Sequence, residues 1–276
     1  MDSDGAPTAL VVAHHHSSSP GWVGRHLADR GYALTTVLLG DGRPVQLPSP
    51  DGFDVVVVLG SSHSVTELDD PRAPSRRWMA PEVAWIADAV RGGARVLGIC
   101  FGAQAMSRAL GGTVDRMPGT QVGWFDLEAA DGADPVFGGP WLEYHDDRFS
   151  VPDGARVLAS DRFCPQAFST GRSLAVQFHP EADLAIVQRW VDRFPTDEAG
   201  LAVGVDRHAL VARTVMVQEA SGRRCLRVMD ILLSLDHGLS LEHGPSPQLN
   251  PSHSSARPRT GASSRSPEPA SWSRRR

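Results

Sequence analysis

Residues 94–104 read Ala-Arg-Val-Leu-Gly-Ile-Cys-Phe-Gly-Ala-Gln. A short apolar run, typical of a buried strand, leads into Cys100, and a helical pattern begins at once over residues 101–110. Gly98 and Gly102 lie two residues on either side of the cysteine. This is the G-x-nucleophile-x-G pattern of a sharp strand-to-helix turn, where side chains at the two outer positions would collide.

Such a turn predicts that the sulfur of Cys100 lies clear of a sheet, at the N-terminus of a helix. There the helix dipole favours a thiolate, and the free backbone amides favour an oxyanion. The alternative interpretation is that Cys100 is a small core residue, as many lone cysteines are. The two glycines and the change from strand to helix favour the nucleophile.

The segments around this turn predict an α/β fold. Before it, apolar runs typical of buried parallel strands alternate with helical patterns. After residue 112 the strand-like runs are short and separated by turn residues, which predicts an antiparallel or mixed extension. The expected architecture is a flavodoxin-like three-layer sandwich with a central, mostly parallel sheet, the antiparallel extension and the strand–nucleophile elbow–helix. The expected segments include strands at residues 9–13, 33–39, 54–59, 113–116 and 122–127, and helices at residues 22–30, 79–91 and 206–233.

A second chemical motif, His179-Pro180-Glu181, ends the strand-like run at residues 173–178. Proline forces the residue before it into an extended conformation, and residues i and i+2 of an extended chain project to the same side. Glu181 can therefore fix the imidazole tautomer of His179, which is the base-plus-orienter half of a nucleophilic triad. The alternative is a chance occurrence of these three residues on the surface.

Two loops that follow strands are candidates for the same region. The loop at residues 60–65 begins with Gly60, and a glycine at a strand end lets backbone amides approach a ligand, as in half of an oxyanion hole. An ordinary strand-to-helix loop is the alternative. Residues 14–16 are three consecutive histidines. Consecutive loop residues do not converge on one ion, so we expect no metal there but a loop at the carboxyl edge of the sheet, near the active site.

Composition restricts the chemistry further. All 27 basic residues are arginine, which excludes a Walker A phosphate loop, a pyridoxal Schiff base and a Ser-Lys dyad. The body of the chain has no basic stripe, so no nucleic-acid partner is expected. The three cysteines are widely spaced, and no apolar run has the length of a signal peptide or a membrane span. These features predict a cytoplasmic protein that does not associate with membranes.

The predicted domain occupies residues 1–236, and residues 237–276 form a Ser/Pro/Arg-rich tail that is expected to be disordered. The tail carries six arginines and one glutamate from Pro245 onward. An interaction role, an unimportant extension and an artefact of gene prediction stay open for it. Cys225 falls on the apolar face of the last helical pattern and is expected to serve packing.

Together these motifs resemble the class I (triad-type) glutamine amidotransferase domain, over residues 9–233. The chain is most similar to stand-alone members related to the glutaminase half of GMP synthase and to γ-glutamyl hydrolases. Residues 98–104 match the family's G-x-C-x-G-x-Q, and residues 177–181 match its second block. The loop at residues 60–65 is similar to the family's G-G-P-x-S-V but has Ser61 and Ser62 in place of the second glycine and the proline.

The resemblance implies hydrolysis of the glutamine side-chain amide through a γ-glutamyl thioester, with no metal and no cofactor. It implies these roles: Cys100 as nucleophile, His179 as proton shuttle, Glu181 as its orienter, the amides of Gly60 and Phe101 as oxyanion hole, and Gln104 and His145 as substrate-binding residues.

Three functions stay open for such a chain. It could release ammonia for a partner synthetase, which would be a separate subunit because the globular length is used up. It could be a self-sufficient hydrolase of γ-glutamyl amides or peptides. It could also be a catalytically silent regulatory or binding relative, which the intact Cys100, His179 and Glu181 argue against. Glutamine or a γ-glutamyl compound is the expected ligand of the first two.

Overall fold

The structure is a computed structural model that describes residues 5–40, 46–193 and 205–235. All of these residues belong to one compact unit of the chain. The predicted boundary at residue 236 and the predicted tail, residues 237–276, lie outside the described residues, so the domain division stays a prediction. Within the described residues, no helix combines the length and the apolar character that crossing a membrane requires.

The described strands form one nine-stranded sheet in the order β2-β1-β3-β4-β9-β8-β7-β5-β6. The first five strands in this order are parallel, and the others continue the sheet in antiparallel fashion. The predicted fold class is confirmed. The parallel strands are β2 (Ala33–Leu38), β1 (Thr8–Ala13), β3 (Val55–Val58), β4 (Val96–Ile99) and β9 (Ser173–Val176), and the antiparallel ones are β8 (Pro165–Thr170), β7 (Arg156–Ser160), β5 (Val114–Ala129) and β6 (Gly139–Phe149).

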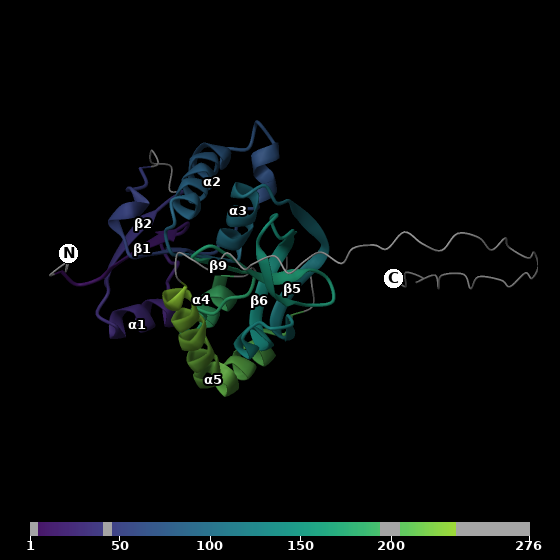
Figure 1. Ribbon diagram of the computed structural model, residues 1–276. Helices are drawn as coiled ribbons and strands as arrows, with labels where there is room; N and C mark the ends of the chain where they lie inside the picture. The colour runs from purple at the N-terminus through teal and green to yellow at the C-terminus, as the bar shows by residue number, and fades with distance from the viewer. Residues whose placement is uncertain (1–4, 41–45, 194–204, 236–276) are drawn as a thin grey trace, which may run out of the picture. The chain divides into compact units, whose positions relative to one another are not determined.

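Helices cover both faces of the parallel strands (Figure 1). Alternate side chains of the strands point to opposite faces, so Val11 and Val57 pack with one pair of helices, and Val12 and Val58 with the other. Burial on both faces explains why these strands read as continuous apolar runs. The first pair is α1 (Gly21–Asp29) and α5 (Arg207–Ser234), and the second is α2 (Arg76–Arg91) and α3 (Phe101–Ala109).

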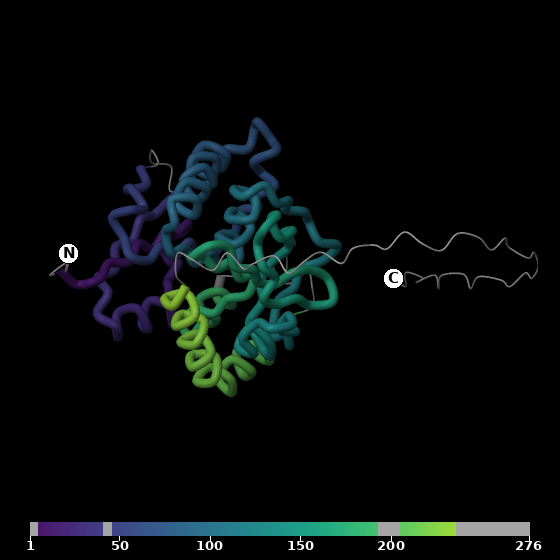
Figure 2. Tube along the Cα trace, in the orientation of Figure 1, coloured from purple at the N-terminus to yellow at the C-terminus, as the bar shows by residue number. Residues whose placement is uncertain are grey.

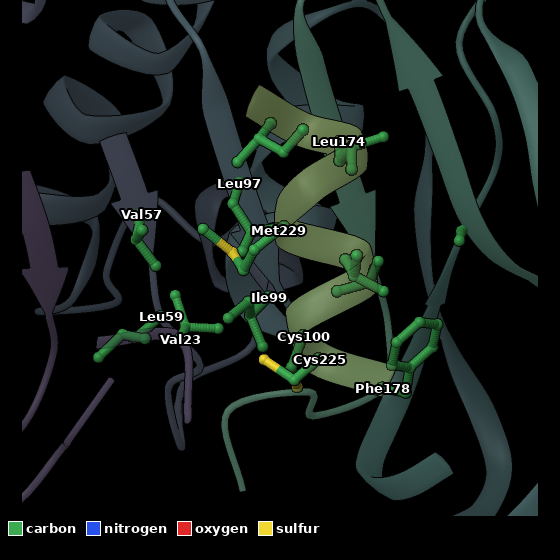
Figure 3. Packing of buried hydrophobic residues seen from close by; sticks show 14 of the residues in the cluster. Val23, Val57, Leu59, Leu97, Ile99, Cys100, Leu174, Phe178, Cys225 and Met229 are labelled. Carbon is green, nitrogen blue, oxygen red and sulfur yellow. The ribbon is translucent and has the colours of Figure 1, made fainter. Parts of the chain in front are cut away.

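The long helix α5 completes the core although it comes from the far end of the described chain (Figure 2). Figure 3 shows Cys225 and Met229 of α5 facing Leu97 and Ile99 of β4. Cys225 is fully buried there, as the apolar face of its helix predicts. The remaining helix, α4 (Leu184–Arg193), packs with the N-terminal part of α5 and with Leu142 of β6.

Two elements differ from the sequence-based prediction. Helix α2 begins at Arg76 and not at Met79, so Pro81 lies inside the helix and not in its first turn. The predicted strands at residues 113–116 and 122–127 belong to one long strand, β5, whose pairing with β6 shifts between Arg116 and Gln121. The shift accommodates a Pro-Gly pair at residues 118–119, which interrupts the local strand pattern because proline has no amide to donate.

Candidate active site

The turn between β4 and α3 places Cys100 in a strained conformation. Its φ is 52° and its ψ is −107°, and among the described residues it is the only one other than glycine with a positive φ. A Cβ on Gly98 would lie 2.6 Å from the carbonyl oxygen of Gly102, and a Cβ on Gly102 would lie 2.2 Å from that of Val58. Neither position has room for a side chain. The flanking glycines are therefore what permits the turn, and the strain falls on the candidate nucleophile, as is common at functional sites.

The residues of the predicted triad lie together at the carboxyl ends of β4 and β9. Nδ1 of His179 lies 2.8 Å from Oε1 of Glu181, and both side chains are buried. Since the carboxylate is an acceptor, Nδ1 carries a proton and Nε2 is left to exchange protons with another group. Nε2 has no hydrogen-bond partner among the described residues.

Gly60, at the end of β3, lies against both the imidazole and the cysteine. A Cβ on Gly60 would be 3.2 Å from Cε1 of His179 and 3.6 Å from Cβ of Cys100. Phe101 is the first residue of α3, so its amide is one of the four that have no partner inside the helix. The predicted oxyanion donors therefore flank the sulfur, although their role stays a prediction.

The charges around His179 favour the protonated form of its ring, the imidazolium. Burial by itself lowers the pKa of His179, but the Glu181 carboxylate and the Cys100 sulfur raise that pKa well above its usual value. The other two cysteines lie in surroundings that keep the thiol protonated. Burial raises the pKa of the Cys164 thiol to about 12 and that of the Cys225 thiol well above its usual range. The geometry thus favours Cys100 as the nucleophilic sulfur.

Replacing Glu181 with glutamine is expected to lower the pKa of His179. The change removes a carboxylate charge that raises this pKa and leaves in place the burial that lowers it. At pH 7 less imidazolium is then available to protonate a leaving group, so turnover should fall about 10²- to 10⁴-fold. An NMR titration of the His179 ring measures the pKa directly. Glu219→Gln is the matched control, because its side chain is 89% exposed on α5; an unshifted His179 titration in Glu181→Gln would contradict the assignment.

A cavity of about 460 Å³ opens beside Cys100. Its wall includes His15 and residues 17–19, so the loop after β1 lies at the carboxyl edge of the sheet, close to the cysteine. Within the described part of the chain, no three His, Cys, Asp or Glu side chains are arranged to hold a metal ion.

The two predicted substrate-binding residues line this cavity. Their polar atoms also bind the protein: Nε2 of Gln104 donates to Oε1 of Gln177 at 3.2 Å, and Nδ1 of His145 donates to the carbonyl oxygen of Asp147 at 2.8 Å. Nε2 of His145 lies 3.1 Å from Oε2 of Glu143. The structure places both residues at the site, and contact with a substrate stays a prediction for them.

Several residues at the site were not predicted from the sequence. Gly21 has a φ of 45°, and a Cβ there would lie 1.9 Å from the carbonyl oxygen of Glu181, which also accepts the amide of Trp22 at 2.9 Å. The N-terminus of α1 thus holds the backbone of Glu181 in place. The ring of Trp190 packs edge-on against His179, with centroids 4.8 Å apart. The one local signal in the sequence was the Pro-Gly pair at which α1 begins.

The sequence also did not predict one buried carboxylate near the site, that of Glu143. Glu143 is completely buried on β6, and burial raises its pKa, while the hydrogen bond and charge of His145 lower it. Alternation along β6 places the two on the same side of the strand. A glutamate is usually exposed, so nothing in the sequence indicated its burial.

Comparison with known proteins agrees with the geometry. The model of the family "Glutamine amidotransferase class-I" matches residues 25–189. GMP synthase [glutamine-hydrolyzing] from Brucella melitensis is 31% identical over 185 residues, which cover 61% of this chain and 34% of the relative. The same enzyme from Brucella ovis gives 31% identity, with 61% and 33% covered. The chain therefore spans about a third of the length of these curated relatives.

Solved structures show the same fold. A glutamine amidotransferase from Thermotoga maritima superposes with a TM-score of 0.72 at 19% identity, covering 83% of this chain and 99% of the other. One from Methylobacillus flagellatus gives a TM-score of 0.67 at 19% identity, with 87% and 99% covered. The predicted family is confirmed: the chain belongs to the class-I glutamine amidotransferase family.

Proposed function

We propose that this enzyme hydrolyses the side-chain amide of glutamine through Cys100, His179 and Glu181, and that it releases the ammonia for a separate synthetase. The observation that carries the proposal is the strained Cys100 at the N-terminus of α3, beside an imidazole that Glu181 orients at 2.8 Å. The curated relatives are named as glutamine-hydrolysing enzymes, which supports glutamine as the substrate.

In the first half-reaction, the Cys100 thiolate attacks the amide carbon of the glutamine side chain, and the carbonyl electron pair moves onto oxygen. The amides of Phe101 and Gly60 receive this oxyanion. As the intermediate collapses, the C–N bond breaks, and Nε2 of the His179 imidazolium donates its proton to the leaving nitrogen. Ammonia and a γ-glutamyl thioester result.

In the second half-reaction, water attacks the thioester carbon while His179, now neutral, takes a proton from it. The C–S bond breaks, and glutamate and the Cys100 thiolate are released. Tyr144 also lines the cavity, but burial, with the charges of Asp146 and Cys100, raises its pKa to about 12. Its phenol stays neutral at pH 7, so His179 is the base of this step.

A second candidate is hydrolysis of larger γ-glutamyl amides or peptides. The observation in its favour is the volume of the cavity, about 460 Å³, which falls in the range that holds drug-sized ligands, about 300–1,000 Å³. Free glutamine would leave part of such a cavity empty. The two candidates share the chemistry at Cys100 and differ in the leaving group, which is ammonia in one and an amine in the other.

The test is release of ammonia or amine by the full chain from glutamine and from a panel of γ-glutamyl amides and dipeptides. We expect turnover of glutamine. Faster turnover of a γ-glutamyl peptide would replace the first candidate by the second. If every substrate is inert, alkylation by a glutamine-like chloroketone decides: labelling of Cys100 that glutamine prevents would support the proposal, and absence of selective labelling would overturn it.

A further inference from the structure

A buried histidine–glutamate pair lies next to the triad without belonging to it. His14 follows β1, and Glu82 lies in the middle of α2. Nε2 of His14 is 2.9 Å from Oε1 of Glu82, and Nδ1 of His14 is 3.2 Å from the carbonyl oxygen of Gly60. The side chains of the pair are only 1% and 0% exposed. An ionisable pair this deeply buried is costly, so its geometry calls for an explanation.

The two hydrogen bonds together determine which ring nitrogens carry a proton. The carbonyl oxygen of Gly60 can only accept, so its bond to His14 requires a proton on Nδ1. The bond at Nε2 is then made either by an imidazolium that donates to the Glu82 carboxylate or by a protonated Glu82 that donates to a neutral ring. In both states Nδ1–H points at Gly60, and Glu82 binds the opposite side of the ring and holds its orientation.

Packing fixes the plane of the same ring. The ring of Phe101 meets His14 edge-on, with centroids 4.7 Å apart, and that of Trp78 lies 5.4 Å away. Phe101 is the residue that follows the nucleophile. His14 therefore contacts both backbone segments that flank the Cys100 sulfur: it binds the Gly60 carbonyl and packs against Phe101.

We propose that His14, oriented by Glu82, is a positioning residue that fixes the peptide plane between Gly60 and Ser61 for the tetrahedral intermediate; this rests on the function proposed above. The described residues contain no cis peptide bond, so the Ser61 N–H points opposite to the Gly60 carbonyl, away from His14. Gly60, Ser61 and Cys100 all line the catalytic cavity. The peptide held in this way adds the Ser61 N–H to the proposed donors, the amides of Gly60 and Phe101. A donor that is already in place meets the developing oxyanion without reorganisation, which is how such donors accelerate a reaction.

Two substitutions separate the two hydrogen bonds of the ring. In His14→Asn the side-chain amide nitrogen can occupy the place of Nδ1 and keep the bond to Gly60, while contact with Glu82 is lost. In His14→Gln the amide reaches the place of Nε2, so the contact with Glu82 is kept and the donor to Gly60 is lost. His14→Asn removes the partner of the buried Glu82 carboxylate, so it should have the lower melting temperature of the two. A larger loss of kcat in His14→Gln therefore cannot be explained by lower stability.

We expect His14→Gln to lower kcat for glutamine about 10- to 100-fold with KM unchanged, because a misplaced donor affects the transition state more than the substrate. His14→Asn should retain most of kcat. The matched control is His26→Gln, because Nε2 of His26 also binds a backbone carbonyl, that of Gly222 at 2.8 Å, on the side of α1 that faces α5. Its kcat should equal that of the wild type.

A second readout does not depend on turnover. The ¹⁵N chemical shift of the Ser61 amide reports the hydrogen bond at the Gly60 carbonyl, and it should move in His14→Gln but stay near its wild-type value in His14→Asn. Equal losses of kcat in the two variants, or an unmoved Ser61 signal in His14→Gln, would overturn the proposal. If the wild-type chain neither hydrolyses glutamine nor is labelled at Cys100 by the chloroketone, the proposed function fails, while the Ser61 signal still decides the role of His14.

Discussion

Cys100→Ser is expected to release ammonia from glutamine at least about 10⁴-fold more slowly than the wild type, since loss of a nucleophile from such a triad typically costs even more. A serine hydroxyl beside His179 stays protonated at pH 7, whereas the cysteine can give its proton to an imidazole whose pKa is raised. A coupled assay for ammonia measures the loss, and the melting temperature verifies that the variant is folded.

The matched control for this experiment is Cys164→Ala. Cys164 is also buried, but burial and the carboxylates of Asp161 and Glu143 raise the pKa of its thiol to about 12, so turnover should not change. Residual activity of Cys100→Ser above a hundredth of the wild-type rate would contradict the proposed dependence on the Cys100 thiol.

Gly102→Ala is expected to disrupt the turn that holds the nucleophile. The new methyl group would lie 2.2 Å from the backbone oxygen of Val58, a distance that requires β3 and α3 to move apart. Overpacking of this kind costs up to about 3 kcal/mol of the free energy of unfolding, which lowers the melting temperature by about 6–12 °C in a domain of this size. Turnover should fall as well, because the displaced helix carries the amide of Phe101.

The control for the glycine experiment is Gly52→Ala. A Cβ on Gly52 meets nothing within 4 Å, and its φ does not require glycine, so the melting temperature should stay the same or rise slightly. Calorimetry of both variants measures the contrast. Equal melting temperatures for Gly102→Ala and the wild type would show that α3 can shift without cost, contrary to the packing described here.

The sequence was informative where the geometry is local. The spacing of Gly98, Cys100 and Gly102 specifies a turn, and the proline between His179 and Glu181 specifies an extended pair, so both motifs could be predicted from a few adjacent residues. The parallel strands are continuous apolar runs because both of their faces are buried, so they too could be predicted from a few adjacent residues.

Contacts between distant segments could not be predicted in this way. Gly21 touches Glu181, and His14 meets Glu82, only because α1, α2 and the sheet pack as they do. No residue near His14 in the sequence indicates a buried carboxylate partner, since the approach of two elements depends on the sum of many packing contacts. The same holds for Glu143, whose burial follows from the strands and helices around β6.

The position of β9 has a consequence for how the chain folds during synthesis. Of the nine described strands, β9 is the last along the chain, but in the sheet it lies between β4 and β8. Leu97 of β4 pairs with Leu174 of β9. On the ribosome, the parallel half of the sheet keeps an open edge at β4 until residue 176 has emerged, and such distant pairings form slowly. His179 lies three residues after the end of that strand, so the proposed triad can be complete only after the strand that closes the sheet has emerged.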